Sequence, residues 1–541
     1  MNHMLRKYSR RYSDERNVNV QVRKKAIWGI GNICNQIIDG ELLSDIDFFI
    51  DNSIDKAGKE IFGRRIIHPS QIKDWKEIYV IIAIENYTAV KEQLILYDMH
   101  EHRDFIWYRD LLQNQDIELI IKDAERFLES IGQYKKYKGA KLIFSDFLAF
   151  DKGVCDYVNR WNEIDGSLIL FSEAGKVGNE REKKISIPVV NLPAILEHNR
   201  YIKHNKEIRV DEKVERYVEE REYLVETVKN LKMGNLDMAD GYEYYVCYYA
   251  DIIVREIIKY CHPRQIIIWN AFYAFHIIVK CICKELDVDI KYMEFGNVPG
   301  TIIIEKSGQM GESWPARYVE DFEKISVTDD EFVKTQELLK ELKQSGINRN
   351  VQPNNNALES IKHKIINDRP IILYAGQNDN ASGMQPYTAN TKKYHSPQYT
   401  SSDEAALHLA KICEKKGWNY IYKPHPMMMR NCDKMSFPKN TIIVDDVNIN
   451  ELIDMSDAIV TILSTVSYIA LIREKPVVML GYTQLKNKGC TYEAFEKYKV
   501  ESEIVKSLEI GYTRSMSDNF AKHVVRLNKY YFLQEKEIWN N

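Results

Sequence analysis

Short apolar runs alternate with helical stretches over residues 371–481, and this alternation constrains the fold more than any other feature of the sequence. The runs at residues 370–375, 418–422 and 475–480 are bounded by Gly or Pro. Runs of this length predict buried strands, and the helices between them favour parallel pairing. The pattern therefore predicts an α/β domain built from βαβ units.

The composition is that of a globular chain with several domains. A chain of 541 residues suggests about three domains. Hydrophobic residues make up 45% and charged residues 28%, which excludes a wholly disordered chain. The net charge of −4 provides no basic field of the kind that nucleic-acid binding uses, so we expect no nucleic-acid partner.

The sequence carries no signal for a membrane span. No apolar run approaches the ~18 residues that cross a bilayer, and the N-terminal stretch has no signal-peptide core. We therefore expect a cytoplasmic protein. The basic residues 6–11 are either part of a solvated polar tail or a weak contact with the anionic inner face of the plasma membrane.

A first candidate domain covers residues 23–112 and contains a degenerate dinucleotide-binding fingerprint. Gly29 and Gly31 occupy the first two positions of G-x-G-x-x-G after a short strand, whereas Cys34 stands at the third. Asp51 follows the next strand at about the expected ~20 residues. One interpretation is a bound nucleotide, with its phosphate on the turn amides and its ribose near Asp51. The other is that the glycines only permit a tight strand–helix turn.

Polar residues also follow the predicted strands of the middle region. Asn270 ends the run at residues 265–270, and Glu294 follows the run at 289–293 before a Gly- and Pro-containing loop. Ligands bind outside the carboxyl ends of strands in open α/β sheets, so both residues are candidates for a cleft. Glu294 is either a general base that also binds acceptor hydroxyls, or a carboxylate that caps loop amides. Glu312 and Ser313 lie in a further loop of this kind.

The strand at residues 370–375 exits into a loop rich in Gly, Asn and Asp. Asp379 in this loop is a candidate catalytic base or nucleophile, with Gln377 as its orienting partner. The other interpretation is ordinary Asn/Asp turn chemistry. The loop runs on to about residue 399, and loops of that length in compact domains are usually functional or mobile.

Two further motifs in this region suit phosphate binding. Proline on both sides of His425 favours extended backbone at Lys423 and His425, which fixes the imidazole at the strand end and points it into the cleft. The other interpretation is a structural His in a rigid turn. The imidazole and the Lys423 ammonium can both bind a phosphate. Ser464 and Thr465 stand at a predicted helix start, where hydroxyls and unpaired amides either cap the helix or bind an anion as well.

In this order and on these elements, the motifs resemble those of two-domain GT-B glycosyltransferases of bacterial capsule and lipopolysaccharide synthesis. The similarity is to capsule-type Kdo transferases and to bacterial sialyltransferases, which use CMP-activated sugars. His425-Pro426 matches their phosphate-contacting His-Pro motif, and Ser464-Thr465 matches their Ser-rich helix start. The segment at 23–112 is similar to small Rossmann-like domains attached to bacterial polysaccharide enzymes.

Two motifs depart from the family pattern. The spacing from Gln377 to Asp379 is shorter than in the Gln…Asp loop of Kdo transferases. Phe295 replaces an acidic residue in what resembles an acidic-acidic-Gly motif that begins at Glu294. The resemblance therefore implies Asp379 and Glu294 as catalytic residues less directly than it implies the phosphate site.

The resemblance implies an α/β fold with a GT-B-like pair of Rossmann-type domains after the small first one. The expected divisions are a polar tail (1–22), the first domain (23–112), an acceptor domain (113–345), a linker (346–365), a nucleotide-sugar domain (366–510) and a C-terminal helix that packs back (511–541). The implied reaction moves a sugar from a nucleotide donor to a polysaccharide or glycolipid acceptor. No cofactor or metal is required, because the cationic and hydroxyl groups offset the phosphate charge. The alternatives are a teichoic-acid-type CDP-polyol phosphotransferase and a non-catalytic scaffold of a capsule-assembly complex.

Overall fold

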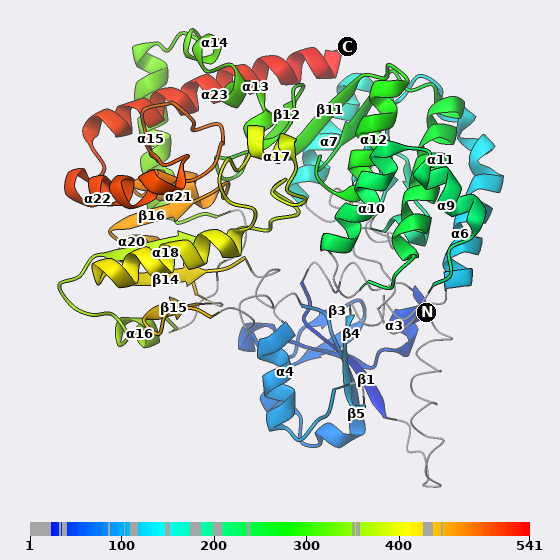
Figure 1. Cartoon of the computed structure of the whole chain (residues 1–541). Helices are drawn as coiled ribbons and strands as arrows, with labels where there is room; N and C mark the ends of the chain where they lie inside the picture. The colour runs from blue at the N-terminus through cyan, green and yellow to red at the C-terminus, as the bar shows by residue number, and fades with distance from the viewer. Residues whose placement is uncertain are drawn as a thin grey trace. The chain divides into compact units, whose positions relative to one another are not determined.

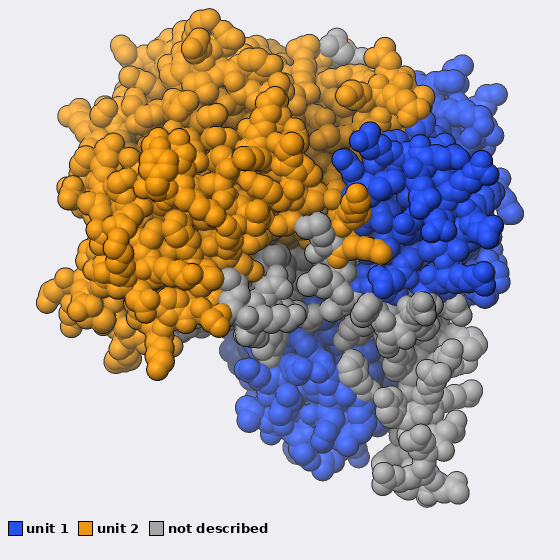
Figure 2. All heavy atoms as spheres, in the orientation of Figure 1, with its two compact units in different colours: residues 1–228, 235–263 blue, residues 229–234, 264–541 orange. Residues whose placement is uncertain are grey.

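The computed structural model divides the chain into two compact units (Figures 1 and 2), which are described separately. Unit 1 comprises residues 1–228 and 235–263, and unit 2 comprises residues 229–234 and 264–541. The structure describes residues 23–31, 34, 40–84, 87–101, 103–108, 117–145, 152–173, 185–197, 208–234, 238–348, 352, 357–425, 436–444 and 447–540.

Unit 1 begins with a six-stranded sheet in the order β3-β4-β2-β1-β5-β6. Every neighbouring pair is parallel except β3 with β4. The elements are β1 (Lys24–Trp28), α3 (Gly40–Asp45), β2 (Phe48–Ile50), β3 (Glu60–Ile61), β4 (Arg64–Ile67), β5 (Ile78–Ile82), α4 (Tyr87–Leu96) and β6 (Phe105–Trp107). The central strands are buried apolar runs, and the predicted Rossmann-like first domain is confirmed.

The rest of unit 1 combines three parallel strands with long helices. Strand β8 pairs in parallel with both β7 and β9. The elements are α6 (Ile117–Ser130), β7 (Lys141–Ser145), α7 (Lys152–Asp165), β8 (Leu168–Ser172), β9 (Val189–Asn191), α9 (Glu212–Glu219), α10 (Glu222–Gly234), whose last residues belong to unit 2, and α11 (Tyr242–Cys261).

Unit 2 opens with β10 (Gln265–Ile268), α12 (Ala274–Glu285), β11 (Ile290–Phe295) and β12 (Ile302–Glu305). Strands β10 and β11 are parallel, whereas β12 runs antiparallel to β11. The chain then forms α13 (Trp314–Arg317), α14 (Val319–Glu323), α15 (Asp329–Ser345) and α16 (Ala357–Lys362). Thr328 and Glu331 form a capping box at the start of α15, which explains why this helix begins there.

A parallel six-stranded sheet follows, in the order β15-β14-β13-β16-β17-β18. Its elements are β13 (Ile371–Ala375), α17 (Ala389–Tyr394), α18 (Ser402–Lys416), β14 (Asn419–Lys423), β15 (Thr441–Ile443), α20 (Ile449–Met455), β16 (Ala458–Thr461), α21 (Val466–Ile472), β17 (Val477–Met479), β18 (Tyr492–Glu493) and α22 (Val500–Ile510). The strands fall on the predicted apolar runs, and the α/β class is confirmed. Ser401 caps α18 by accepting a hydrogen bond from the Glu404 amide.

The chain ends in α23 (Arg514–Asn540), which packs against α15 and β12 (Figure 1). One buried apolar cluster includes residues from β12, from the last sheet and from α23, among them Ile303, Leu373 and Tyr531. Within the described ranges, no helix combines the length and apolar character needed to cross a membrane.

Candidate functional site

The last sheet has a topological switch point beside β13. The chain passes from β13 to β14 and β15 on one side, and then crosses to β16, β17 and β18 on the other. The loops that leave β13 and β16 therefore diverge at the carboxyl edge of the sheet. Open α/β sheets bind their ligands at this position.

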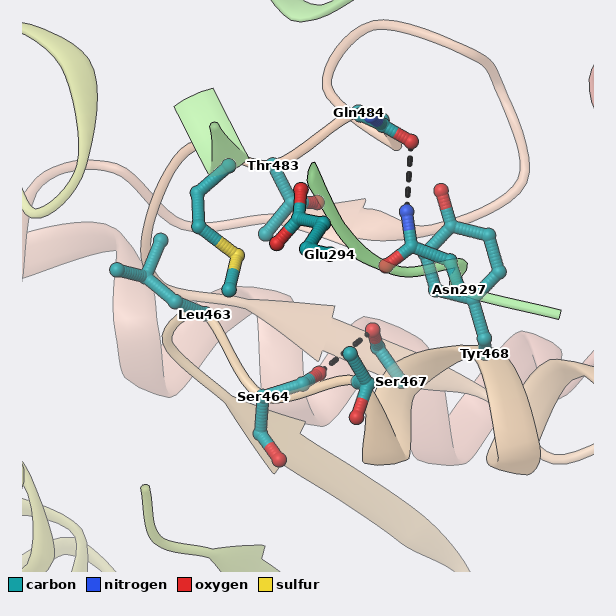
Figure 3. A pocket seen from close by; sticks show the side chains of 10 residues that line it. Glu294, Asn297, Leu463, Ser464, Ser467, Tyr468, Thr483 and Gln484 are labelled. Atoms are coloured by element: carbon teal, nitrogen blue, oxygen red, sulfur yellow. Dashed lines mark hydrogen bonds between the residues drawn. The ribbon is translucent and has the colours of Figure 1, made fainter. Parts of the chain in front are cut away.

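A small pocket lies beside the loop that follows β16. Its walls come from the β16–α21 turn, the loop after β17, the segment after β11 and the turn before α13, all within unit 2 (Figure 3). The lining residues are Glu294, Asn297, Met310, Leu463, Ser464, Thr465, Ser467, Tyr468, Thr483 and Gln484. Three residues predicted from sequence, Glu294, Ser464 and Thr465, therefore share one pocket.

Ser464 and Thr465 form the turn into α21, which has seven residues. The Ser464 hydroxyl oxygen lies 3.3 Å from the Val466 amide nitrogen and accepts its hydrogen bond. A hydroxyl group that accepts one bond still has a hydrogen to donate. Ser467 donates to the Ser464 carbonyl at 2.9 Å, which braces the turn from below. The turn thus offers hydroxyl hydrogens to a ligand anion.

Glu294 enters the same pocket from the opposite side. It lies on β11, where it pairs with Ile303 of antiparallel β12, and its side chain is half-buried. Figure 3 shows its carboxylate directed between Leu463 and Asn297. A carboxylate and a hydroxyl-bearing turn across one pocket can act on two groups of one ligand, or on two ligands.

Gln377 is buried behind this pocket and fixes the turn that forms it. Its side-chain oxygen accepts a hydrogen bond from the Leu463 amide at 2.8 Å. Its amide nitrogen donates to the Ser382 hydroxyl at 3.2 Å, within its own loop. Gln377 therefore ties the loop after β13 to the loop after β16.

Asp379 is buried, with 1% of its surface exposed, and does not line the pocket. One carboxylate oxygen accepts a hydrogen bond from the Ser402 amide at 2.9 Å, at the start of α18. The other oxygen is buried without a hydrogen-bond partner. Burial raises the pKa of Asp379 to about 7, although the bond from the Ser402 amide opposes this. The group can exchange a proton near neutral pH, and its catalytic role stays a prediction.

Lys423 and His425 lie at the carboxyl end of β14, beside the start of the β13 loop. The Lys423 carbonyl accepts a hydrogen bond from the Gly376 amide at 2.9 Å, so the two strand ends stay together. A Cβ at Gly376 would come within 3.2 Å of Pro424, so a larger residue there would make a tight contact. Both side chains are half-buried and neither lines the pocket. Pro426 lies outside the described residues.

Asn270 and Glu312 connect the β10–β12 segment to the loop after β13. Asn270 donates a hydrogen bond to the Ala381 carbonyl at 3.0 Å. Glu312 accepts one from Asn390 at 2.5 Å and lies 3.8 Å from the His395 ring nitrogen. Burial opposes ionisation of Glu312, but His395, Lys280 and Asn390 outweigh it and lower its pKa to about 2.

Ser313 is fully buried next to this contact. Its hydroxyl donates to the Met310 carbonyl at 2.7 Å, which closes the turn into α13. The structure thus places Asn270, Glu312 and Ser313 in contacts that hold unit 2 together, and none of them lines the pocket. Their predicted orienting roles remain predictions.

The glycines of the first domain differ in their surroundings. A Cβ at Gly29 would come within 2.2 Å of Ile84, and its φ is +98°, so both the space and the backbone require glycine. A Cβ at Gly31 would meet nothing within 4 Å. The Asp51 carboxylate accepts from the Ser53 amide at 2.9 Å and pairs with Lys56 at 3.0 Å. These contacts account for Gly29 and Asp51 structurally, and nucleotide binding here stays a prediction.

Sequence reasoning missed Asn297, Gln484 and His395. Asn297 and Gln484 follow β11 and β17 by a few residues and meet in a 2.6 Å hydrogen bond across 187 positions. Glu294 was predicted because polar residues that follow strand ends are candidates for a cleft. The same rule could have found Asn297 and Gln484. His395 lies inside the long loop after β13, where no strand end marks it.

In the described part of the chain, no group of three or more His, Cys, Asp or Glu side chains is placed to hold a metal ion. The pocket itself contributes a single carboxylate, that of Glu294. Its other polar lining groups are hydroxyls and amides, which suit hydrogen bonding to a ligand.

Comparisons with known proteins point to polysaccharide synthesis. Residues 334–507 match the model of the capsule polysaccharide biosynthesis protein family, and residues 21–104 match that of the C2185-like N-terminal domain. The first match covers the switch-point sheet, in the segment where the resemblance to capsule enzymes was expected. No match was found among curated protein sequences.

Several solved structures resemble the chain. A β-Kdo 2,7 transferase, KpsC of Thermosulfurimonas dismutans, is 15% identical with a TM-score of 0.32, covering 50% of this chain and 79% of its own. The β-Kdo 2,4 transferase of the same protein is 14% identical, with a TM-score of 0.35 and coverage of 49% and 79%. A UDP-GlcNAc 2-epimerase of Methanocaldococcus jannaschii is 11% identical, with a TM-score of 0.33 and coverage of 73% and 99%. Likenesses of this size leave the activity to be argued from the chain's own residues.

Proposed function

We propose that this chain, whose residues 334–507 match the capsule polysaccharide biosynthesis family, is a glycosyltransferase. It moves a sugar from a nucleotide donor, CMP-linked and Kdo- or sialic-acid-like, to a cell-surface polysaccharide acceptor. The observation that carries the proposal is the meeting of Glu294 with the Ser464–Thr465 turn in one pocket at the switch point. The family match supports the polysaccharide acceptor.

In the proposed reaction, the donor phosphate lies against the hydroxyls of Ser464 and Thr465. Lys423 and His425, at the end of a nearby strand, supply positive charge to the nucleotide when the donor is bound. These groups stabilise the charge that develops on the departing phosphate, so the proposed chemistry requires no metal.

Glu294 removes the proton of the acceptor hydroxyl in this scheme. The acceptor oxygen then bonds to the anomeric carbon, and the bond from that carbon to the phosphate oxygen breaks. The bonding electrons leave with the nucleotide. General-base catalysis of this kind contributes about 10²–10⁴-fold in rate.

The reaction takes place where nucleotide sugars are made, so we place the protein in the cytoplasm, at the inner face of the plasma membrane. The first domain is a second candidate nucleotide site in this proposal, through Gly29, Gly31 and Asp51. Separate substitutions in the donor pocket and in the first domain would test the two candidate sites independently.

Calorimetry with CMP-sugars, UDP-sugars and CDP-glycerol tests the proposal. We expect a CMP-sugar to bind, and Ser464→Ala and His425→Ala to weaken it about tenfold, which corresponds to ~1.4 kcal/mol. Ser502→Ala, at an exposed hydroxyl on α22, is the matched control and leaves affinity unchanged.

Turnover separates catalysis from binding. Glu294→Gln keeps the affinity for the donor and lowers kcat by at least about 10²-fold if Glu294 is the base. Binding of CDP-glycerol alone would point instead to a polyol phosphotransferase. Binding of no nucleotide by the wild-type chain would reject the proposal.

A further inference from the structure

A chain of hydrogen bonds runs from a buried carboxylate to the pocket wall. Glu305, at the end of β12, is fully buried and accepts four hydrogen bonds. Two come from the amides of Lys306 and Ser307, each at 3.0 Å. The others come from the hydroxyls of Tyr530 at 2.9 Å and Tyr531 at 3.3 Å, both on α23.

The direction of these bonds is set at Glu305. A carboxylate can only accept, so the Tyr531 hydroxyl hydrogen is committed to it. The Tyr531 oxygen then accepts from the side-chain nitrogen of Gln484, and that amide turns its oxygen toward the pocket wall. There it accepts a hydrogen bond from the Asn297 side-chain nitrogen at 2.6 Å.

The Asn297 side chain directs its nitrogen to Gln484 and therefore turns its oxygen the other way. Figure 3 shows that oxygen turned away from Gln484, on the side of Glu294.

We propose that Asn297 determines the base specificity of the donor pocket by accepting a hydrogen bond from an exocyclic amino group, and that Gln484 and Tyr531 are positioning residues. This inference rests on the proposed function. Cytosine carries an amino group at the position where uracil carries a carbonyl oxygen. An Asn297 oxygen held in place would accept a hydrogen bond from the cytosine amino group and would repel the uracil carbonyl oxygen. The structure thus supplies a reason, independent of any relative, for a cytidine nucleotide.

Tyr531→Phe tests the relay by removing one hydroxyl. Gln484 then loses its nitrogen's acceptor, so its amide and that of Asn297 can reverse and present a donor to the pocket. Calorimetry with CMP and UMP as probes measures the result. We expect the wild-type chain to prefer CMP at least about tenfold and the variant to bind both within about twofold, which is a loss of ~1 kcal/mol of discrimination.

Tyr530→Phe is the matched control. It removes a bond to the same Glu305 carboxylate but none to Gln484, so it keeps the preference for CMP. Asn297→Ala, at the half-buried pocket wall, removes the acceptor directly and also loses the preference, which keeps the test decisive should Tyr531→Phe unfold.

The outcomes separate the inference from the proposed function. Equal binding of CMP and UMP by the wild-type chain would overturn the inference and leave the glycosyltransferase proposal standing. The inference would also be overturned if both Tyr531→Phe and Asn297→Ala kept the preference for CMP. The same holds if Tyr530→Phe abolished that preference. Binding of neither nucleotide would overturn both.

Discussion

The side-chain oxygen of Gln377 accepts a hydrogen bond from the backbone amide of Leu463 at 2.8 Å, across 86 positions of the chain. Both groups are buried, and Leu463 lines the pocket. This single bond holds the turn that carries Ser464 and Thr465 against the loop after β13. The shape of the pocket therefore depends on a residue that does not touch its contents.

Replacing Gln377 by Ala should destabilise the protein. The buried Leu463 amide would lose its partner, which costs about 1–3 kcal/mol. Urea denaturation measures this loss, and Gln336→Ala on the exposed face of α15 is the control, expected within about 0.5 kcal/mol of wild type. Equal stability of the two variants would show that water or a neighbour replaces the lost acceptor.

Asp379 should make stability fall as the pH rises toward neutrality. Burial raises its pKa to about 7 from 3.8, so between these values the folded state keeps a proton that the unfolded state releases. The resulting loss in the free energy of unfolding grows from about pH 4 to about pH 7 and is then constant, reaching about 4 kcal/mol at most.

Asp379→Asn removes this titration. We expect the variant to lose that part of the pH slope and to be more stable than wild type at pH 8, by chemical denaturation at several pH values. A wild-type slope that persists in the variant would assign it to other groups. The activity of the same variant tests the predicted catalytic role of Asp379 separately.

The contribution of Glu312 to stability should depend on pH in the opposite sense to that of Asp379. Burial disfavours its charge, but His395, Lys280 and Asn390 lower its pKa to about 2, below the ordinary value of 4.5. The folded state therefore binds this proton less readily than the unfolded state, and the stabilisation is present above about pH 4.5 and lost as the pH falls toward 2.

Glu312→Gln should destabilise the protein by up to about 3 kcal/mol at pH 7 and by much less at pH 3. Glu323→Gln, at the partly exposed pair with Arg526, is a control with a smaller effect, since half-exposed ion pairs contribute at most about 1 kcal/mol. A Glu312→Gln penalty that stays the same at pH 3 would point to lost packing instead of lost charge.

Gly29 and Gly31 form a matched pair in the first domain. Gly29→Ala should cost at least about 1–3 kcal/mol, because φ is +98° and the new Cβ would meet Ile84 at 2.2 Å. Gly31→Ala should be tolerated, because a Cβ there meets nothing within 4 Å. Thermal unfolding of the two variants checks this, and equal melting temperatures would contradict it.

The strands could be predicted from the sequence because each is a buried apolar run that a short segment of sequence reveals. β13, β14 and β17 fall on the expected runs to within one or two residues at most of their ends, and the expected turn at Ser464 leads into α21. Local chemistry decides such features: burial of a continuous apolar run, a hydroxyl at a helix start, a proline.

Pairings across long stretches of chain could not be predicted in the same way. Asn297 meets Gln484 across 187 positions, and Glu305 meets Tyr531 across 226. No pattern within either segment specifies its partner, since one amide or hydroxyl suits many acceptors. The pocket's carboxylate and hydroxyl turn were therefore predictable as separate motifs, whereas the network that supports them required the fold.

The packing of α23 against β12 has a consequence for synthesis on the ribosome. Glu305 is made well before Tyr531, and at about 5–20 residues per second the intervening 226 positions take about 10–45 s. During that interval the carboxylate lacks both of its tyrosine hydroxyls, and Gln484 lacks its anchor once it is made. The nascent chain thus has no base-selective pocket with which to capture nucleotides before α23 folds onto it.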